Sequence, residues 1–276
     1  MSYATILVHC DVSKSISHRL AVATDLAQHF GARLVGLHVR RHFETPAFLD
    51  GGFAMGDFFK IFHEGVKADE TEASAAFTKA TKGKELATEW RSVDGYVDTE
   101  LAVQARYADL VVVGQAGAEP TATPADLPET VALTTGRPVL VVPFIRTKAP
   151  SRVVLLCWNA SREAARAAAD ALPFLKAAQQ VIVLVVNPMF SAEGHGAEPG
   201  ADVAAWLARH GVKVTVQRDV APDADVGGVI LSRTADHEAD LIVMGIYGHS
   251  RMREMVLGGA SRTLLASMTV PVFMSH

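Results

Sequence analysis

The sequence predicts an α/β protein built as two tandem, doubly wound domains, each with a five-stranded parallel sheet. Short runs of Val, Ile and Leu without polar alternation are typical of strands buried on both faces, as in parallel sheets. Helical patterns separate these runs, and alternating strands and helices require right-handed crossovers between parallel strands. The third observation is an internal repeat that relates the two halves of the 276-residue chain.

The repeat is visible in two pairs of segments. Residues 108–117 match residues 239–248 at eight of ten positions when Val/Ile and Val/Met count as equivalent, at an offset of 131 residues. Residues 6–13 correspond to residues 154–161 at an offset of 148. Because the second offset is larger, the first repeat contains an insertion of about 17 residues between these landmarks.

We expect one domain over residues 1–146 and a second over residues 151–276, joined by a short polar segment with a proline. A join of this length favours two domains that pack together. In the second half we expect strands near residues 152–157, 181–186, 212–217, 240–245 and 270–274. We expect helices near residues 161–178, 200–210, 224–238 and 252–268.

Four residues fall where a doubly wound sheet binds its ligands, beyond the carboxyl ends of the strands. Asp11 and Asn159 occupy equivalent positions after the first strand of each half. Gly114 and Gly245 end the fourth strands. These positions mark the edge at which we expect any site to lie.

Composition excludes several classes of protein. Apolar residues make up 49% of the chain, which excludes a disordered polymer, and a net charge of −4 gives no general attraction to nucleic acid. The two cysteines, Cys10 and Cys157, cannot form a disulfide framework, which favours a reducing compartment. The chain shows neither a signal-peptide pattern at its start nor about 18 consecutive apolar residues. We therefore expect a cytoplasmic protein that binds neither nucleic acid nor membrane.

The segment from Gly245 to Ser261 is the most informative for chemistry. Its glycines let backbone N–H groups approach a ligand, and the following helix N-terminus adds local positive charge, so the segment suits a phosphate group. Glycines also occur in ordinary strand-to-helix turns, so a packing role stays open. Three of them, Gly245, Gly248 and Gly258, have the spacing Gly-x2-Gly-x9-Gly.

This spacing resembles that of the universal stress protein family, whose nucleotide-binding members carry the same three glycines followed by Ser or Thr. The resemblance covers essentially the whole chain and includes the tandem arrangement. It implies two Rossmann-like domains and a stress-response module that binds an adenine nucleotide, ATP, in the second repeat. AMP and ADP stay open as ligands, with or without Mg²⁺. It also implies that the final strands, at residues 138–142 and 271–274, pair edge to edge within the chain, as a pseudo-dimer, or between chains.

The resemblance assigns roles to a set of residues in the second half. Asn159 is expected at the ribose or base, the valines at the adenine, and the glycines with Arg251 at the phosphates. Two positions depart from the family pattern, because Asn159 stands where Asp is expected and Gly259 where Ser or Thr is expected. The expected nucleotide-binding residues are Asn159, Val185, Val186, Met244, Gly245, Gly248, Arg251, Gly258, Gly259, Ala260 and Ser261.

The first half is expected to hold a degenerate nucleotide site. It retains Asp11, but the third glycine is absent. Two carboxylates, Glu119 and Asp126, would repel phosphate, and three prolines in the same stretch remove N–H donors. Its expected role is to complete a pseudo-symmetric pair with the second half.

The sequence does not imply catalysis. The chain contains no H-E-x-x-H, C-x-x-C or G-x-S-x-G motif, so metal-dependent and hydrolase chemistry have no support. Two alternatives to nucleotide binding stay open. One is a weak ATP hydrolase, for which Glu254 is the available carboxylate in the glycine-rich segment. The other is an interaction scaffold that binds no nucleotide.

The insertion accounts for a Gly- and Phe-rich stretch at residues 40–60. Phe43, Phe48, Phe53 and Phe58 recur at five-residue spacing, which fits neither a helix nor a strand. We therefore expect an irregular loop that covers part of the surface or contacts a second chain.

Overall fold

The computed structural model describes residues 2–42, 54–116, 123–145, 147–150, 152–188, 197–246 and 259–276. In the first half the elements are β1 (Thr5–His9), α1 (Ile16–Phe30), β2 (Arg33–Arg40), α2 (Ala54–Thr81), β3 (Thr88–Asp94), α3 (Val97–Ala105), β4 (Leu110–Gly114), α4 (Leu127–Thr134) and β5 (Val139–Val142). In the second half they are β6 (Val153–Cys157), α5 (Arg162–Asp170), α6 (Leu172–Ala177), β7 (Gln180–Val186), α7 (Ala201–Arg209), β8 (Val214–Asp219), α8 (Val226–Asp236), β9 (Leu241–Gly245), α9 (Gly259–Ser267) and β10 (Val272–Ser275).

The strands form one ten-stranded sheet in the order β3-β2-β1-β4-β5-β10-β9-β6-β7-β8. Each half contributes five parallel strands, and the two halves have the same order when each is read from its outer edge inward. At the centre β5 and β10 pair antiparallel, with Leu140 opposite Phe273. The predicted fold class is therefore confirmed, and the final strands pair within the chain.

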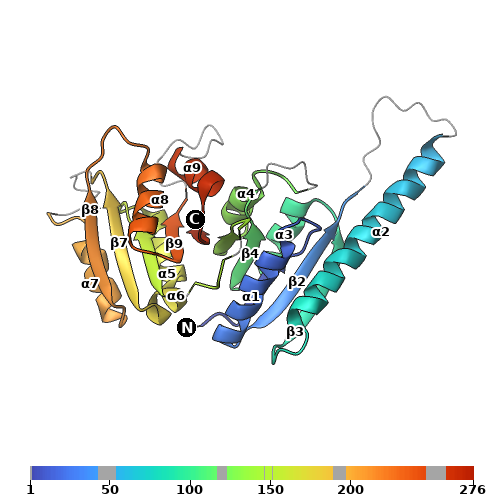
Figure 1. The fold of residues 1–276 in the computed structure, drawn as a ribbon, viewed down its shortest axis with the longest axis horizontal. Helices are drawn as coiled ribbons and strands as arrows, with labels where there is room; N and C mark the ends of the chain where they lie inside the picture. Colours follow the sequence, from blue (N-terminus) through green and yellow to red (C-terminus); the bar gives the residue numbers. More distant parts are fainter. Residues whose placement is uncertain are drawn as a thin grey trace.

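Helices cover both faces of this sheet (Figure 1). One face packs against α1, α2, α5, α6 and α7, and the other against α3, α4, α8 and α9. In β7, Val183 belongs to the first core and Ile182 to the second, and both side chains are buried. Burial on both faces explains why the strands read as continuous apolar runs.

The second-half elements lie close to their predicted positions, with two differences at helices. The helix expected over residues 161–178 is broken at Ala171, because Pro173 has no N–H to continue the helical hydrogen bonds. The helix expected from residue 252 is described from Gly259 onward, and residues 252–258 lie outside the described residues.

The expectation of an irregular loop over residues 40–60 is wrong for its last part. Helix α2 begins at Ala54, so Phe58 lies on a helix. Phe43, Phe48 and Phe53 lie outside the described residues. The five-residue spacing of the phenylalanines was therefore the wrong signal, because the period that matters continues beyond residue 60, where Ala73 and Phe77 bury one face of the same helix.

An aromatic cluster packs the two halves together. The ring of Tyr3 lies edge-on to Phe30 at 5.0 Å and tilted against Phe174 at 5.5 Å, and Phe174 lies 5.8 Å from Phe273. The Tyr3 hydroxyl donates a hydrogen bond of 2.8 Å to the carbonyl oxygen of Asp170. Tyr3, which precedes β1, and Phe30 of α1 thus contact Phe174 of α6, which in turn packs on Phe273 of β10.

Gln115 adds a polar link between the halves. Its side-chain amide donates to the carbonyl oxygens of Leu265 at 2.8 Å and Ala266 at 3.2 Å, and its oxygen accepts the Phe144 N–H at 3.1 Å. The last carbonyls of a helix have no partner within the helix. Because β5 and β10 run in opposite directions, Gln115, which follows β4, lies beside the C-terminus of α9 and caps it.

Replacing Phe273 by Ala should destabilise the whole chain by about 3–5 kcal/mol, because Phe273 is fully buried at the junction and its loss leaves a cavity. Urea unfolding monitored by circular dichroism measures this change. Val220→Ala, at a position 79% exposed, is the matched control and should change the free energy of unfolding by less than about 0.5 kcal/mol. Equal effects of both substitutions would contradict the assigned role of the junction.

Candidate functional site

Asn159 lies in a tight turn just beyond the carboxyl end of β6. Its side-chain oxygen accepts the N–H of Ser161 at 3.2 Å, and the Ser161 hydroxyl oxygen accepts the N–H of Ala164 at 3.1 Å, which caps α5. Asn159 itself is exposed. The same turn occurs in the first half, where Asp11 accepts the N–H of Ser13 at 3.1 Å. The amide group of Asn159 is therefore presented at the expected edge of the sheet.

Gly245 ends β9 directly beside this turn. A Cβ atom at this position would collide with the backbone of Glu163 and Ala164, in the first turn of α5. Only glycine lets the helix approach the strand so closely. Since β9 pairs with β6, Gly245 and Asn159 follow neighbouring strands at the same edge of the sheet.

The start of α9 supplies the next three predicted residues. Gly259 is exposed, and a Cβ atom placed there would meet no heavy atom within 4 Å. Ala260 is half-buried and Ser261 is buried. The remaining phosphate-site predictions, Gly248, Arg251 and Gly258, lie outside the described residues.

The apolar residues expected near adenine differ in their placement. The side chain of Val185 is fully buried against the α7 side of the sheet, so it offers no wall to a ligand, and only its backbone is left for that role. Met244 is also buried, in the opposite core. Val186 is half-buried at the end of β7. Of these three side chains, that of Val186 alone is partly accessible.

The first half differs because Asp11 is engaged by a buried arginine. Arg19, on α1, is 2% exposed and places Nη2 2.6 Å from Asp11 Oδ1 and 3.0 Å from Ser13 Oγ. Its Nη1 lies 3.4 Å from His9 Nδ1, and its guanidinium lies against Gly114. The position equivalent to Arg19 in the second half is Ala167, which is buried and apolar.

Sequence reasoning missed Arg19 and His9. The available signal was a cation on the apolar face of α1, between Ile16 and Leu20, where the corresponding helix of the second repeat has alanine. A charge in such a stripe indicates a buried partner of opposite charge.

This buried cluster shifts the acidity of its members. Burial would raise the pKa of the Asp11 carboxyl, but Arg19 and His9, together with the hydrogen bonds from Arg19 and Ser13, outweigh it and hold that pKa far below its usual range. Burial lowers the pKa of His9 to about 4, and Asp11 opposes this shift only in part. At neutral pH the cluster therefore holds a neutral histidine beside an ion pair.

A cavity of about 420 Å³ lies over this cluster. His9, Asp11 and Arg19 line its floor, and Gln115, Leu127 and Phe144 are among its other lining residues. The sequence predicts a degenerate site in the first half, and the described residues give this region a cavity whose single carboxylate is already paired.

A protein-family model matches the second half of the chain. The model of the universal stress protein family matches residues 150–276. This half of the chain, residues 150–276, is a universal stress protein domain. No curated protein matches the chain in sequence.

The universal stress protein fold extends over both halves. A universal stress protein from Archaeoglobus fulgidus DSM 4304 is 17% identical, with a TM-score of 0.70 over 98% of this chain and 95% of that one. A protein of unknown function from Pseudomonas aeruginosa PAO1 is 15% identical, with a TM-score of 0.56 over 99% of this chain and 92% of that one. At these identities the likeness concerns the fold. Within the described residues, no helix has the length and apolar character needed to cross a bilayer.

The His9 cluster predicts a stability loss in mild acid. His9 titrates near 6.5 when unfolded and near 4 when folded, so the stability that it contributes is present above pH 6.5 and is lost as the pH falls toward 4, by about 3 kcal/mol. Asp11, whose folded pKa is depressed, loses its contribution at still lower pH. Urea unfolding at a series of pH values measures both.

His9→Gln should remove the dependence between pH 6.5 and 4, because the residue no longer titrates. His42→Gln, at an exposed position, is the control and should leave the profile as in the unmodified chain. A profile that is flat across this range in the unmodified chain would show that His9 does not carry the effect.

Proposed function

We propose that the second half binds an adenine nucleotide, ATP in the first instance, and serves as a stress-response module. The observation that supports this proposal most strongly is that three predicted parts of the site lie at the same edge of the sheet. Asn159 follows β6 and Gly245 ends the neighbouring strand β9. Helix α9, which is described from Gly259 onward, leads into β10, which is parallel to β9. The family match over residues 150–276 supports this assignment.

The residues present fit a nucleotide phosphate and a sugar or base. Gly259 is exposed, and a Cβ atom there would meet no heavy atom within 4 Å, so the first described residue of α9 leaves room for an anion. The exposed amide of Asn159 can both donate and accept hydrogen bonds with a ribose or base, although it carries no charge. These residues bind and orient a ligand, and none of them is placed to take a proton from it.

The first half is proposed to bind no nucleotide. The carboxylate of Asp11, which corresponds to Asn159, is held by Arg19 and Ser13, so its hydrogen-bonding capacity is directed inward. Arg19 also lies against Gly114, at the position equivalent to Gly245. One nucleotide per chain is therefore expected.

Native mass spectrometry of protein purified without added nucleotide separates this proposal from its alternatives. Retained ATP supports binding without turnover, and retained ADP after incubation with ATP supports a weak hydrolase. A chain that stays free of nucleotide even at millimolar ATP supports the interaction scaffold.

Gly248→Asp should abolish most ATP binding. The family resemblance assigns Gly248 to the phosphates, so a carboxylate there should repel them, and the loss should be at least about 2 kcal/mol, which is more than tenfold in affinity. Gly117→Asp makes the same change at the equivalent position of the first repeat and should leave the affinity unchanged. Titration calorimetry gives affinity and stoichiometry together. Two equal sites, or binding that survives Gly248→Asp, would contradict the proposal.

Gly259→Ser should tighten ATP binding roughly tenfold, because the hydroxyl can donate a charge-assisted hydrogen bond to phosphate. The space around Gly259 admits the new side chain, so the fold should not change. Titration calorimetry measures the gain, with Gly259→Ala as the control that adds the Cβ atom without the hydroxyl. An equal affinity for both variants would mean that backbone N–H groups or Ser261 already satisfy the phosphate.

A further inference from the structure

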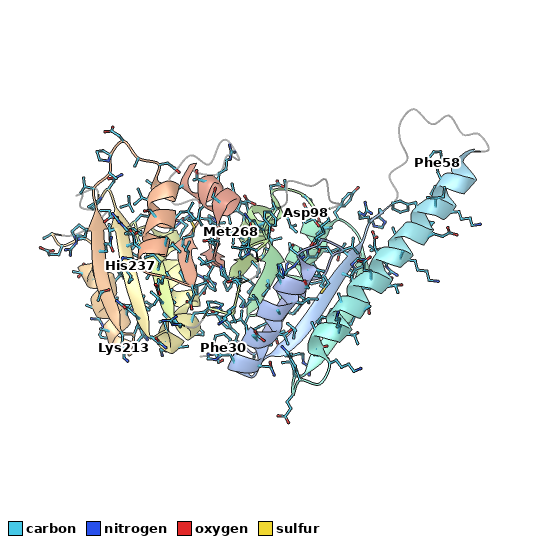
Figure 2. The ribbon with its side chains drawn as sticks, viewed as in Figure 1. Phe30, Phe58, Asp98, Lys213, His237 and Met268 are labelled. Carbon is cyan, nitrogen blue, oxygen red and sulfur yellow. The ribbon has the colours of Figure 1, made fainter. Side chains whose placement is uncertain are left out.

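Helix α2 presents an exposed stripe that the fold of one chain does not use. The helix has 28 residues, whereas its counterpart α7 in the second half has nine. Its C-terminal part packs in the core through Ala73 and Phe77. Its N-terminal part extends past the body of the protein, with Phe58 near the N-terminal end of the helix (Figures 1 and 2). The insertion in the first repeat is thus largely a helix extension.

The stripe has the spacing of a helix-pairing seam. Phe58 is 52% exposed and Ile61 is 68% exposed, and the next positions on the same side of the helix are also exposed. Alternating steps of three and four residues keep all of these positions on one side of a helix and are typical of a coiled-coil seam. The members of this stripe are Phe58, Ile61, Gly65, Ala68, Glu72 and Ala75.

The stripe differs from the other two sides of α2, of which one packs on the body of the protein and one is polar. Val66, Ala73 and Phe77 turn toward the body. Lys60, Glu64 and Lys67 form an exposed polar side. The stripe lies between these two sides and is exposed although most of its members are apolar or small.

Gly65 points independently to a close-packed partner. Glycine is the least favourable residue after proline inside a helix. A Cβ atom at Gly65 would meet nothing within 4 Å, so the fold of a single chain does not require glycine there. An approaching helix backbone would require it, as at other close crossings.

We propose that the stripe on α2 pairs with the α2 stripe of a second copy of this chain, in antiparallel orientation. In the antiparallel register Phe58 lies opposite Ala75, Ile61 opposite Glu72, and Gly65 opposite Ala68. Each large side chain of one copy then meets a small residue or a flexible aliphatic stem of the other. A parallel pair would set Glu72 against Glu72 and Gly65 against Gly65, which adds like-charge repulsion and a void.

A groove lies where the antiparallel register places the partner's aromatic ring. The cavity of about 670 Å³ beside the C-terminal end of the stripe has Trp90 and Ala75 in its lining, together with polar and charged residues: Glu70, Thr71, Ser74, Thr78, Lys79 and Lys82. Phe58 of the second copy, opposite Ala75, is directed to this groove. On the flank of the seam, Glu64 faces Thr71 of the other copy, so the register brings no pair of like charges together.

The size of the stripe predicts a weak, reversible dimer. From Phe58 to Ala75 it runs about 26 Å at 1.5 Å per residue, which is a single helix seam. Such a seam falls below the standard area of about 1,600 Å² for stable complexes. The dimer is therefore expected to dissociate on dilution.

Sedimentation velocity of the full chain over a range of concentrations tests the proposal. The unmodified chain should form a dimer that dissociates on dilution, and Ile61→Glu should raise the dimer dissociation constant at least tenfold. Lys60→Glu makes the neighbouring, polar-side change and should alter it less than threefold. Gly65→Leu, which has open space in one chain and replaces a poor helix former, should keep or raise the melting temperature and weaken the dimer at least tenfold.

Disulfide trapping tests the register. In Ile61→Cys/Glu72→Cys the two cysteines of one helix are about 16 Å apart, beyond the reach of a disulfide, so any bond joins two chains. Burial raises the pKa of the native Cys10 and Cys157 thiols to about 12, so these thiols stay unreactive at neutral pH. The double variant should form a covalent dimer, and Ile61→Cys alone should not.

Three results would overturn the proposal. The first is a monomer at every concentration, and the second is a dimer that Ile61→Glu and Gly65→Leu leave intact. The third is a chain that dimerises only after residues 43–53 are deleted, because the stripe would then be covered by the chain itself.

Discussion

The antiparallel pairing of β5 with β10 is the constraint on which the rest of the structure depends. Both strands are buried along their whole length, and each would otherwise be an open edge of its five-stranded sheet. The opposite directions of the two strands determine which other elements meet. They bring α1 of the first half against α6 of the second half at the Tyr3 cluster, where Phe30 packs on Phe174, and they set Gln115, which follows β4, beside the end of α9. The two halves thus share one core on each face of a single sheet.

The sequence predicts most of the fold because its signals are local and repeated. Buried strands appear as unbroken apolar runs, and matching segments at offsets of 131 and 148 residues relate the halves, so the carboxyl-edge positions of Asn159 and Gly245 follow directly. The features that the sequence does not predict are contacts between elements in the tertiary structure. The close approach of α5 to Gly245, the burial of the Val185 side chain and the pairing of Arg19 with Asp11 depend on how elements pack, which periodicity does not specify. The phenylalanine spacing predicts a loop over residues that belong to α2, because the helical pattern that continues this helix lies beyond residue 60.

The two halves have the same fold, but equivalent positions hold a buried ion pair in the first half and uncharged residues in the second. In the first half a buried cation, Arg19, neutralises the carboxylate after the first strand, and burial alone would make either charge costly. In the second half the cation is replaced by Ala167 and the carboxylate by an amide, so neither charge needs compensation. The two replacements belong together, because replacing only one member of the pair would leave the other as a buried charge without a partner. The pair of changes leaves Asn159 facing outward, whereas Asp11 faces inward.

The cap that Gln115 forms on α9 makes the two sides of the junction chemically different. At the position equivalent to Gln115 the second half has Ile246, whose buried side chain has no group to donate. Two second halves brought together in the same way would leave the carbonyls of Leu265 and Ala266 facing an isoleucine. Two first halves would lack the aromatic contacts that Phe174 and Phe273 supply. Pairing of two first halves or of two second halves through this junction is therefore disfavoured. Because the two halves are covalently linked, each meets the unlike half at high effective concentration.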